Sequence, residues 1–252
     1  LFVGLGSIGQ RHLRNLRCVA GDSVEVIAFR SKKHTPVLDE QQQVVENTDL
    51  AQQYKIREFN DLDQALADKP DIAFITNPTS LHIDTAIRCA SLGMHLFIEK
   101  ALSNTLTGLA ELKIICQKNQ LTTYIAYNMR FHEVLIKVKE LIKDKKILHI
   151  RTVCSSFLPN WRPGTNHLKS YSALSSQGGG IILDSSHELD YLNFLFGPLQ
   201  SIRGNFGKIN NVTVDVEDYA NILATLKNGL IANIHLNFMS LICERKLTID
   251  FQ

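Results

Sequence analysis

The first nine residues, LFVGLGSIG (Leu1–Gly9), decide the fold of this chain. An apolar run typical of a buried strand leads into the pattern G-x-G-x-x-G, and helical spacing follows. Glycines at these positions allow a tight turn, close approach of the backbone to a pyrophosphate, and close packing of helix on strand. Because the pattern stands at a strand-to-helix junction, we expect it to bind a dinucleotide. The candidate contact residues are Gly4, Gly6, Ser7, Ile8 and Gly9.

The residues up to 124 continue to alternate strand and helix patterns. Apolar runs at Val24–Phe29, Ile72–Thr76 and 95–98 are separated by segments of helical spacing. Strands that are apolar on both faces, with helices between them, are typical of a parallel sheet covered on both sides. We therefore predict an α/β fold over residues 1–124, a doubly wound parallel sheet of the Rossmann type that binds a dinucleotide.

Strand patterns dominate residues 125–252. Leu230–Phe238 alternates apolar and polar side chains, and Asn228-Gly229 before it is a hairpin signal because both residues tolerate positive φ. We predict an α+β domain with a largely antiparallel open sheet, apolar on one face and mostly polar on the other. We expect this domain to bind substrate, to mediate oligomerisation, and to be truncated at its C-terminus, because Gln252 ends a strand pattern.

The composition narrows the class of protein. The chain has 252 residues, of which 44% are hydrophobic and 21% charged, the balance of a globular protein with a sizeable core. Its net charge of +2 is too small to indicate nucleic acid or an anionic membrane as the main partner. No apolar run of about 18 residues and no secretion signal is visible. Five widely spaced cysteines without a C-x-x-C pair favour reduced thiols, so we expect a cytoplasmic protein without a metal site.

The end of the second strand bears on which dinucleotide is bound. NAD sites usually place an Asp or Glu there to hold the ribose 2′-hydroxyl. This chain instead has Arg30, Ser31 and Lys32. A guanidinium and an ammonium beside that ribose would suit the 2′-phosphate of NADP. We therefore favour NADP over NAD; the alternative is that Arg30 and Lys32 are solvated loop charges.

Further motifs follow in a fixed order along the chain. The segment TNPTSLH (76–82) begins at the end of the strand pattern Ile72–Thr76, and HLFIEKAL (95–102) carries Glu99-Lys100 at the end of the strand pattern at 95–98. YNMRF (127–131), a glycine run at 178–180 and DSSHELD (184–190) come next. With the first glycine motif, this ordered set resembles the glucose–fructose oxidoreductase / inositol dehydrogenase / rhizopine catabolism family, written Gfo/Idh/MocA, over essentially the whole chain.

The resemblance implies an NAD(P)-dependent oxidoreductase that acts on sugars, polyols or sugar nucleotides. The E-K-P motif of the family falls on Glu99, Lys100 and Ala101, which makes Lys100 the active-site lysine. The Asp and His of the family fall on Asp184 and His187. Ligands of open α/β sheets bind at the carboxyl ends of the strands, where these motifs lie. The further cofactor candidates are Asn77, Pro78, His82 and Glu99.

The candidate catalytic residues have side chains suited to oxidation of a secondary alcohol. The reaction needs hydride transfer to nicotinamide, a base for the hydroxyl proton, and a charge that stabilises the developing alkoxide. His187 is a natural proton carrier near neutrality, and Lys100 can hydrogen-bond the reacting oxygen. Glu99 could orient Lys100 or accept a hydrogen bond from the nicotinamide ribose. Asp184 could position His187.

Two departures from the family pattern affect these assignments. Ala101 replaces the family's proline, so we expect a trans bond between Lys100 and Ala101, or a strained loop. Asp184 and His187 are three residues apart, whereas many relatives have four. They still share a helix face if the helix has begun by Asp184; if Asp184 is the true anchor, Glu188 takes the histidine position.

Substrate contacts are expected from a second set of residues. Trp161 is the only tryptophan, and its ring beside Arg162 suits sugar stacking or a phosphate contact. The alternative for Trp161 is a buried anchor for a long loop. The substrate-binding candidates are Asn128, Arg130, Trp161, Arg162 and Tyr171.

Two rival functions remain open from the sequence. A non-catalytic dinucleotide-binding sensor would keep the fold and lose the chemistry, and the Ala101 departure supports that possibility. A reductase of a non-sugar carbonyl or imine would keep the chemistry with another substrate. In each case the polar face of the second sheet could pair with another subunit, and we expect a homo-oligomer.

Overall fold

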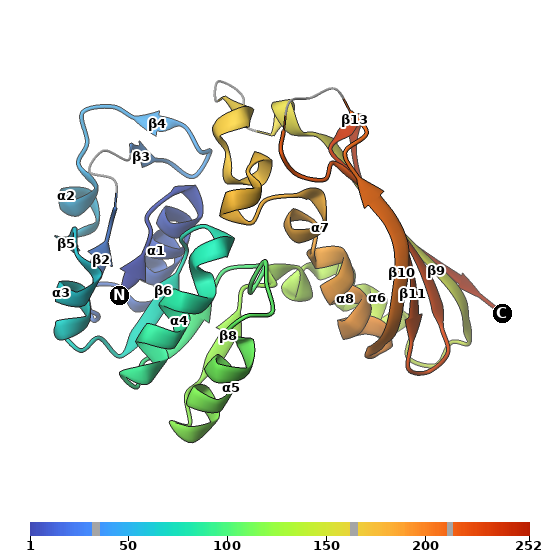
Figure 1. The fold of residues 1–252 in the computed structure, drawn as a ribbon, viewed down its shortest axis with the longest axis horizontal. Coiled ribbons are helices and arrows are strands. Elements are labelled where there is room, and N and C mark those ends of the chain that lie inside the picture. Colours follow the sequence, from blue (N-terminus) through green and yellow to red (C-terminus); the bar gives the residue numbers. More distant parts are fainter. Residues whose placement is uncertain (32–35, 162–165, 211–213) are drawn as a thin grey trace. The chain divides into compact units, whose positions relative to one another are not determined.

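The computed structural model describes residues 1–31, 36–161, 166–210 and 214–252. The chain forms two compact units, Leu1–Ala126 and Tyr127–Gln252, which Figure 1 shows in blue to green and in green to red.

The first unit is built on a six-stranded parallel sheet with the order β5-β2-β1-β6-β7-β8. The order runs outward in both directions from β1, as in doubly wound dinucleotide-binding folds. A separate two-stranded hairpin follows β2. The strands are β1 Phe2–Val3, β2 Ile27–Phe29, β3 Val37–Leu38, β4 Val44–Val45, β5 Arg57–Phe59, β6 Ile72–Ile75, β7 His95–Ile98 and β8 Thr123–Ile125.

Helices cover both faces of this sheet, as the sequence predicts. Alternate residues of a strand point to opposite faces. Val3 therefore lies in a core with side chains of α3, α4 and α5, and Phe2 lies in another core with side chains of α1 and α2. The helices are α1 Ser7–Ala20, α2 Leu50–Tyr54, α3 Leu62–Ala67, α4 His82–Ser91 and α5 Leu109–Lys118. Leu106 precedes the last of these helices and is 87% exposed.

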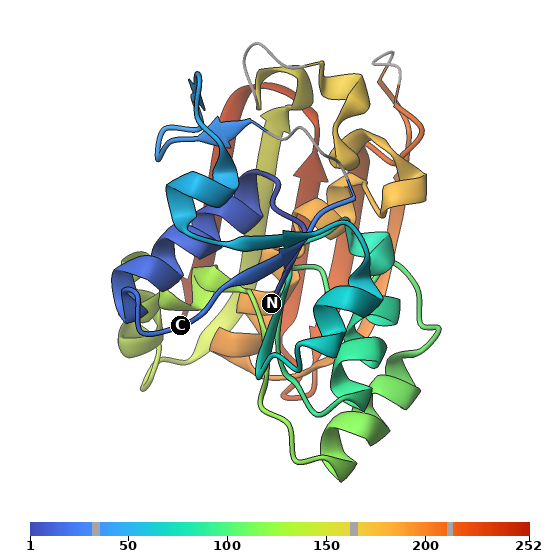
Figure 2. The ribbon, with the colours of Figure 1, turned by 90° about the vertical axis from the view of Figure 1, so that its left-hand side faces the viewer.

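The second unit contains a five-stranded sheet with the order β10-β11-β12-β9-β13. Only β12 and β9 pair in parallel, so the sheet is largely antiparallel as predicted. Figure 2 shows these strands running side by side. The elements are α6 Glu133–Leu141, β9 Ile147–Phe157, α7 Ile181–Asp184, α8 His187–Phe196, β10 Leu199–Gly207, β11 Tyr219–Leu226, β12 Ile231–Asn237 and β13 Met239–Phe251.

The two faces of the second sheet differ in character. Ala232, Ile234 and Leu236 of β12 are buried in a core with α6, α7 and α8. The helices lie on that face, and the opposite face is open in Figure 1. The hairpin predicted at Asn228-Gly229 is confirmed: Gly229 has a φ of 87° and joins β11 to β12. Among the described residues, no helix has the length and apolar character needed to cross a membrane.

Candidate functional site

The glycine turn of the first unit lies between β1 and α1. Gly4 has a φ of 95°, a backbone conformation that favours glycine. A Cβ atom on Gly9 would lie 2.4 Å from the carbonyl oxygen of Gly4 and 2.8 Å from Oγ1 of Thr76. Gly9 is therefore required for the helix to pack closely on the strand ends.

Gly6 differs from its neighbours because the space around it is open. A Cβ atom there would meet nothing within 4 Å among the described atoms. Gly6 caps α1, and Ser7 and Ile8 are the first residues of this 14-residue helix, whose first turn carries no acidic side chain. Open backbone at the positive end of a helix is the environment that a pyrophosphate requires. The residues present thus fit a dinucleotide.

The end of β6 lies against the glycine turn. Oγ1 of Thr76 donates a hydrogen bond to the Gly4 carbonyl at 2.5 Å. Asn77 donates through Nδ2 to Oγ1 of Thr85 at 3.0 Å. Oδ1 of Asn77 is buried and has no hydrogen-bond partner among the described residues. A buried acceptor without a partner is costly, so Asn77 is suited to receive a hydrogen bond from a ligand. Pro78 follows at the N-terminus of a short 3₁₀ turn, Thr79–Leu81.

His82 is buried beneath two strand ends and is only 1% exposed. Its Nδ1 lies 2.8 Å from the carbonyl oxygen of Ala101, and its Nε2 lies 2.9 Å from the carbonyl oxygen of Asn77. Burial lowers the pKa of His82, and the carbonyl contacts oppose this only in part. The imidazole therefore joins the loops after β6 and β7.

Glu99 at the end of β7 is held by His12 of α1. Nε2 of His12 lies 2.6 Å from Oε1 of Glu99, and the Lys100 amide donates to Oε2 of Glu99 at 3.0 Å. The His12 ring also packs edge-on against Phe97. The contact with His12 offsets the desolvation cost of a carboxylate at the end of an apolar strand. His12 is a candidate site residue that the sequence analysis missed.

The peptide bond between Lys100 and Ala101 is cis. The expectation of a trans bond, based on the usual preference of non-proline residues, was therefore wrong. Around this bond, the Ala101 carbonyl contacts His82 and the Lys100 amide contacts Glu99.

Arg30 at the end of β2 is buried, with 7% of its side chain exposed. Its guanidinium pairs through NH1 with Oε1 of Glu58 on β5. Ser31 is exposed. Lys32 lies outside the described residues. The end of β2 carries no acid of its own. The acid beside Arg30 comes from the neighbouring strand, β5.

In the second unit, Asp184 and Tyr171 lie together. The Tyr171 hydroxyl donates a hydrogen bond to Oδ1 of the buried Asp184. Asp184 ends α7 and His187 begins α8, with Ser185 and Ser186 between the two helices. The condition for a shared helix face, one helix that runs from Asp184 to His187, is therefore not met. Between the two helices the Ser186 amide donates to the Leu183 carbonyl, a backbone bond that spans three residues instead of the four of an α-helix.

The structure separates the two candidates for the histidine position. Glu188 has a fully buried side chain that accepts a hydrogen bond from Nε of Arg245 at 2.8 Å. Burial raises the pKa of Glu188, and Arg245 opposes this. His187 is half-buried and packs edge-on against Tyr127. A carboxylate enclosed in this way is a structural group, so His187 is the better candidate for proton transfer.

Arg130 is held by an acid of its own unit. Its Nε and NH2 donate to the two carboxylate oxygens of Asp190 at 2.8 and 2.6 Å, and the Phe194 ring lies beside it. Asn128 is exposed in the 3₁₀ turn Asn128–Phe131. The bidentate pair fixes the guanidinium plane, and a substrate contact of Arg130 stays a prediction.

Trp161 is anchored on one side and open on the other. Its Nε1 donates to Oγ of Ser156 at 2.5 Å, and its ring packs edge-on against Phe238. Trp161 is nevertheless 38% exposed. The ring is thus anchored but not buried, and its contact with a substrate stays a prediction. Arg162 lies outside the described residues.

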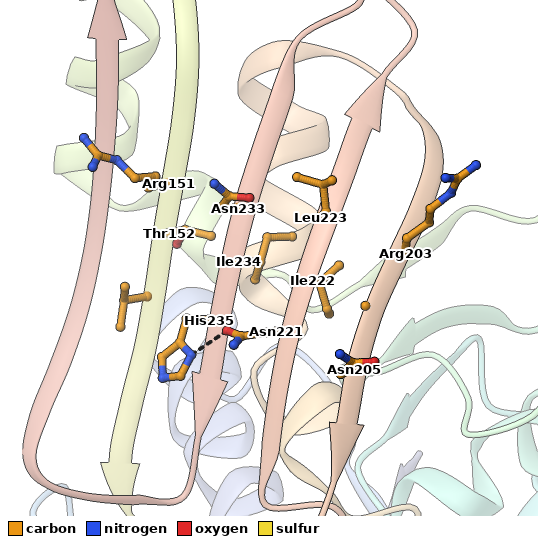
Figure 3. A pocket seen from close by; sticks show the side chains of 12 residues that line it. Arg151, Thr152, Arg203, Asn205, Asn221, Ile222, Leu223, Asn233, Ile234 and His235 are labelled. Atoms are coloured by element: carbon orange, nitrogen blue, oxygen red, sulfur yellow. Dashed lines mark hydrogen bonds between the residues drawn. The ribbon is translucent and has the colours of Figure 1, made fainter.

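A cavity of about 630 Å³ hollows the open face of the second sheet (Figure 3). Arg151 and Arg203 stand at its two sides, and Asn221 bonds His235 across its floor at 2.7 Å. Among the described residues, none of the predicted cofactor, catalytic or substrate residues lines it. The cavity is therefore a feature of the open face and separate from those residues.

Comparison with known proteins gives a consistent result for both units. The pattern of the "Oxidoreductase family, NAD-binding Rossmann fold" matches residues 1–127, and that of the "GFO/IDH/MocA C-terminal domain" matches residues 135–250. The chain belongs to the Gfo/Idh/MocA family. The resemblance inferred from the motifs is thereby confirmed, as is the fold class.

Two curated members of the Gfo/Idh/MocA family illustrate the range of relatives. An uncharacterized oxidoreductase of Synechocystis sp. is 27% identical over 86% of this chain. The NADP(+) scyllo-inositol 2-dehydrogenase of Bacillus subtilis is 25% identical over 64% of it. The matches span 62% and 46% of the lengths of those proteins.

A solved structure shares the fold over nearly the whole chain. The WlbA dehydrogenase from Bordetella pertussis, in complex with NADH and UDP-GlcNAcA, superposes with a TM-score of 0.81. It is 20% identical and covers 98% of this chain and 69% of that one.

Proposed function

We propose that this chain is an NAD(P)-dependent oxidoreductase that transfers a hydride between nicotinamide and a carbon of a sugar, polyol or sugar nucleotide. The observation that carries the proposal is the contrast between Gly9, which no larger residue could replace, and Gly6, which leaves open space at the start of α1. A turn with this contrast suits a pyrophosphate.

The chemical roles follow from the side chains. A bound nicotinamide supplies the hydride acceptor or donor. Lys100 hydrogen-bonds the reacting oxygen and stabilises its developing charge. His187 takes up the hydroxyl proton in oxidation and returns it in reduction. Glu99, held by His12, orients the Lys100 backbone through the bond to its amide.

The preferred cofactor is NADP. In support, the end of β2 carries Arg30 where NAD sites usually have an acid, and the B. subtilis relative is named as NADP(+)-dependent. Asn77, Pro78, Ser31 and Lys32 belong to the same cofactor site, while His82 acts on it through the Asn77 and Ala101 carbonyls.

A nucleotide sugar is the favoured substrate. The WlbA dehydrogenase, with a similar fold, was solved with UDP-GlcNAcA. The proposed contacts are Asn128, Arg130, Trp161, Arg162 and Tyr171, with Asp184 held by Tyr171.

The subunits associate through the open face of the second sheet, where Leu223 and Ile231 remain 45% and 44% exposed beside polar side chains. We also propose that the protein acts in the cytoplasm.

A substrate screen tests the proposed function. The chain is incubated with NAD⁺ or NADP⁺ and a panel of UDP-sugars, free sugars and polyols, and the absorbance of the reduced nicotinamide is followed. We expect turnover with at least one UDP-sugar. Binding of the dinucleotide without turnover of any UDP-sugar, sugar or polyol in either direction would contradict the proposal.

A further inference from the structure

The Glu58 carboxylate contacts the guanidinium of Arg30. Glu58 lies on β5, the edge strand next to β2, where it stands opposite Ala28. Arg30 is two residues beyond Ala28, and its amide donates to the Phe59 carbonyl at 2.9 Å. Residues two apart on a strand share one face of the sheet, so the two side chains are diagonal neighbours. Their charged groups are in contact.

The pairing changes what the guanidinium can offer to a ligand. A free guanidinium has five donors and binds a phosphate through two parallel hydrogen bonds. In this chain NH1 is directed to Glu58, and a carboxylate in contact with the guanidinium offsets part of its positive charge. The Glu58 side chain itself is 29% exposed. A 2′-phosphate approaching Arg30 would meet this second negative charge, whereas a 2′-hydroxyl would not be repelled.

We propose that Glu58 sets the dinucleotide preference of this chain, by restraining the affinity of Arg30 for the 2′-phosphate of NADP. This inference rests on the proposed function, because it assumes that the first unit binds a dinucleotide. It assigns a specificity role to a residue on β5, outside the glycine turn and the end of β2. The preference for NADP is accordingly weaker than Arg30 alone would give.

The test compares the binding of NADPH and NADH by the fluorescence of the reduced nicotinamide. The variants are Glu58→Gln, Arg30→Ala and the double variant. Glu25→Gln is the matched control, since it removes the same charge from an exposed pair with Arg57. In Glu58→Gln we expect the ratio of NADPH to NADH affinity to rise by about tenfold, the effect of one charge on a phosphate contact. The rise should be absent from the double variant and from Glu25→Gln.

Three outcomes would overturn the inference. The ratio could stay unchanged in Glu58→Gln, it could fall, or it could rise equally in Glu25→Gln, which would indicate an effect of net charge. Circular dichroism of each variant verifies that its fold is intact. A wild-type chain that binds neither dinucleotide would overturn the proposed function as well, whereas NADH binding with an unchanged ratio overturns only the role of Glu58.

Discussion

At the scale of single residues, the positions with backbone constraints were predictable, and the long-range partners were not. Gly4, Gly6 and Gly9 could be assigned because the pattern itself states what each glycine must do. Glu99 could be recognised as a charge that needs a partner, but His12 lies 87 residues away along the chain. The same holds for Glu58, since a carboxylate on a short strand has no local signal that points to Arg30. Only the strand order brings such pairs together.

The glycine turn predicts different outcomes for two similar substitutions. Gly9→Ala should lower the free energy of unfolding by about 1–3 kcal/mol or more, because its Cβ would overlap the Gly4 carbonyl. Gly6→Ala should change stability by less than about 0.5 kcal/mol, because nothing described lies within 4 Å. Gly6→Ala should still weaken NADH binding by about tenfold, since its methyl group would enter the anion space.

Urea unfolding and NADH fluorescence titration measure the two effects separately. Equal loss of stability in both variants would contradict the geometry of the turn. Unchanged NADH affinity in Gly6→Ala would contradict the assignment of the open space to a pyrophosphate.

At the scale of elements, strongly patterned segments were predicted well and short or exposed ones were missed. The strand at His95–Ile98 has the bounds expected from its apolar spacing. By contrast, β5 has only the three residues Arg57–Phe59, two of them charged, and β10 is exposed along most of its length. Neither shows the alternation by which a half-buried strand is recognised. The break between α7 and α8 falls at Ser185 and Ser186, and the apolar periodicity of the sequence does not report it.

His82 predicts how the first unit responds to acid. Burial lowers its pKa in the folded chain, so the neutral imidazole is favoured by folding. Its contribution to stability is therefore present above the ordinary imidazole pKa and is lost as the pH falls through and below that range, at about pH 6.5. His82→Gln removes this component, so the stability difference between wild type and variant should shrink on acidification.

Urea unfolding at about pH 7.5 and about pH 5.5 measures this difference. His95→Gln, at an exposed position of β7, is the control and should lose stability in parallel with wild type. If His82→Gln also lost stability in parallel with wild type, His82 would not be the acid-sensitive group.

At the scale of the whole molecule, the division into sheet types was predictable from periodicity alone. Runs apolar on both faces gave the covered parallel sheet, and alternation gave the sheet with one open face. What the open face does is not encoded in that alternation. Its exposed leucine and isoleucine lie beside a cavity of mixed polar and apolar lining, and such a surface suits contact between subunits.

The proposed association predicts the effect of a charge on the open face. Leu223→Glu should lower the sedimentation coefficient of the chain to that of a monomer, because a buried unpaired carboxylate strongly disfavours an interface. Leu106→Glu, at an exposed position of the first unit, should leave the assembly unchanged. A wild-type chain that sediments as a monomer, or an unchanged assembly in Leu223→Glu, would contradict association through this face.

The central claim, that Lys100 acts on the reacting oxygen of an oxidoreductase, is tested most directly by Lys100→Ala. NADH affinity and the turnover of the UDP-sugar found in the screen are measured side by side, with Lys118→Ala, an exposed lysine of α5, as the control. We predict that Lys100→Ala retains NADH affinity and loses about a hundredfold or more in turnover, the scale of one group that stabilises a developing charge. Turnover of Lys100→Ala at the wild-type rate would contradict the account.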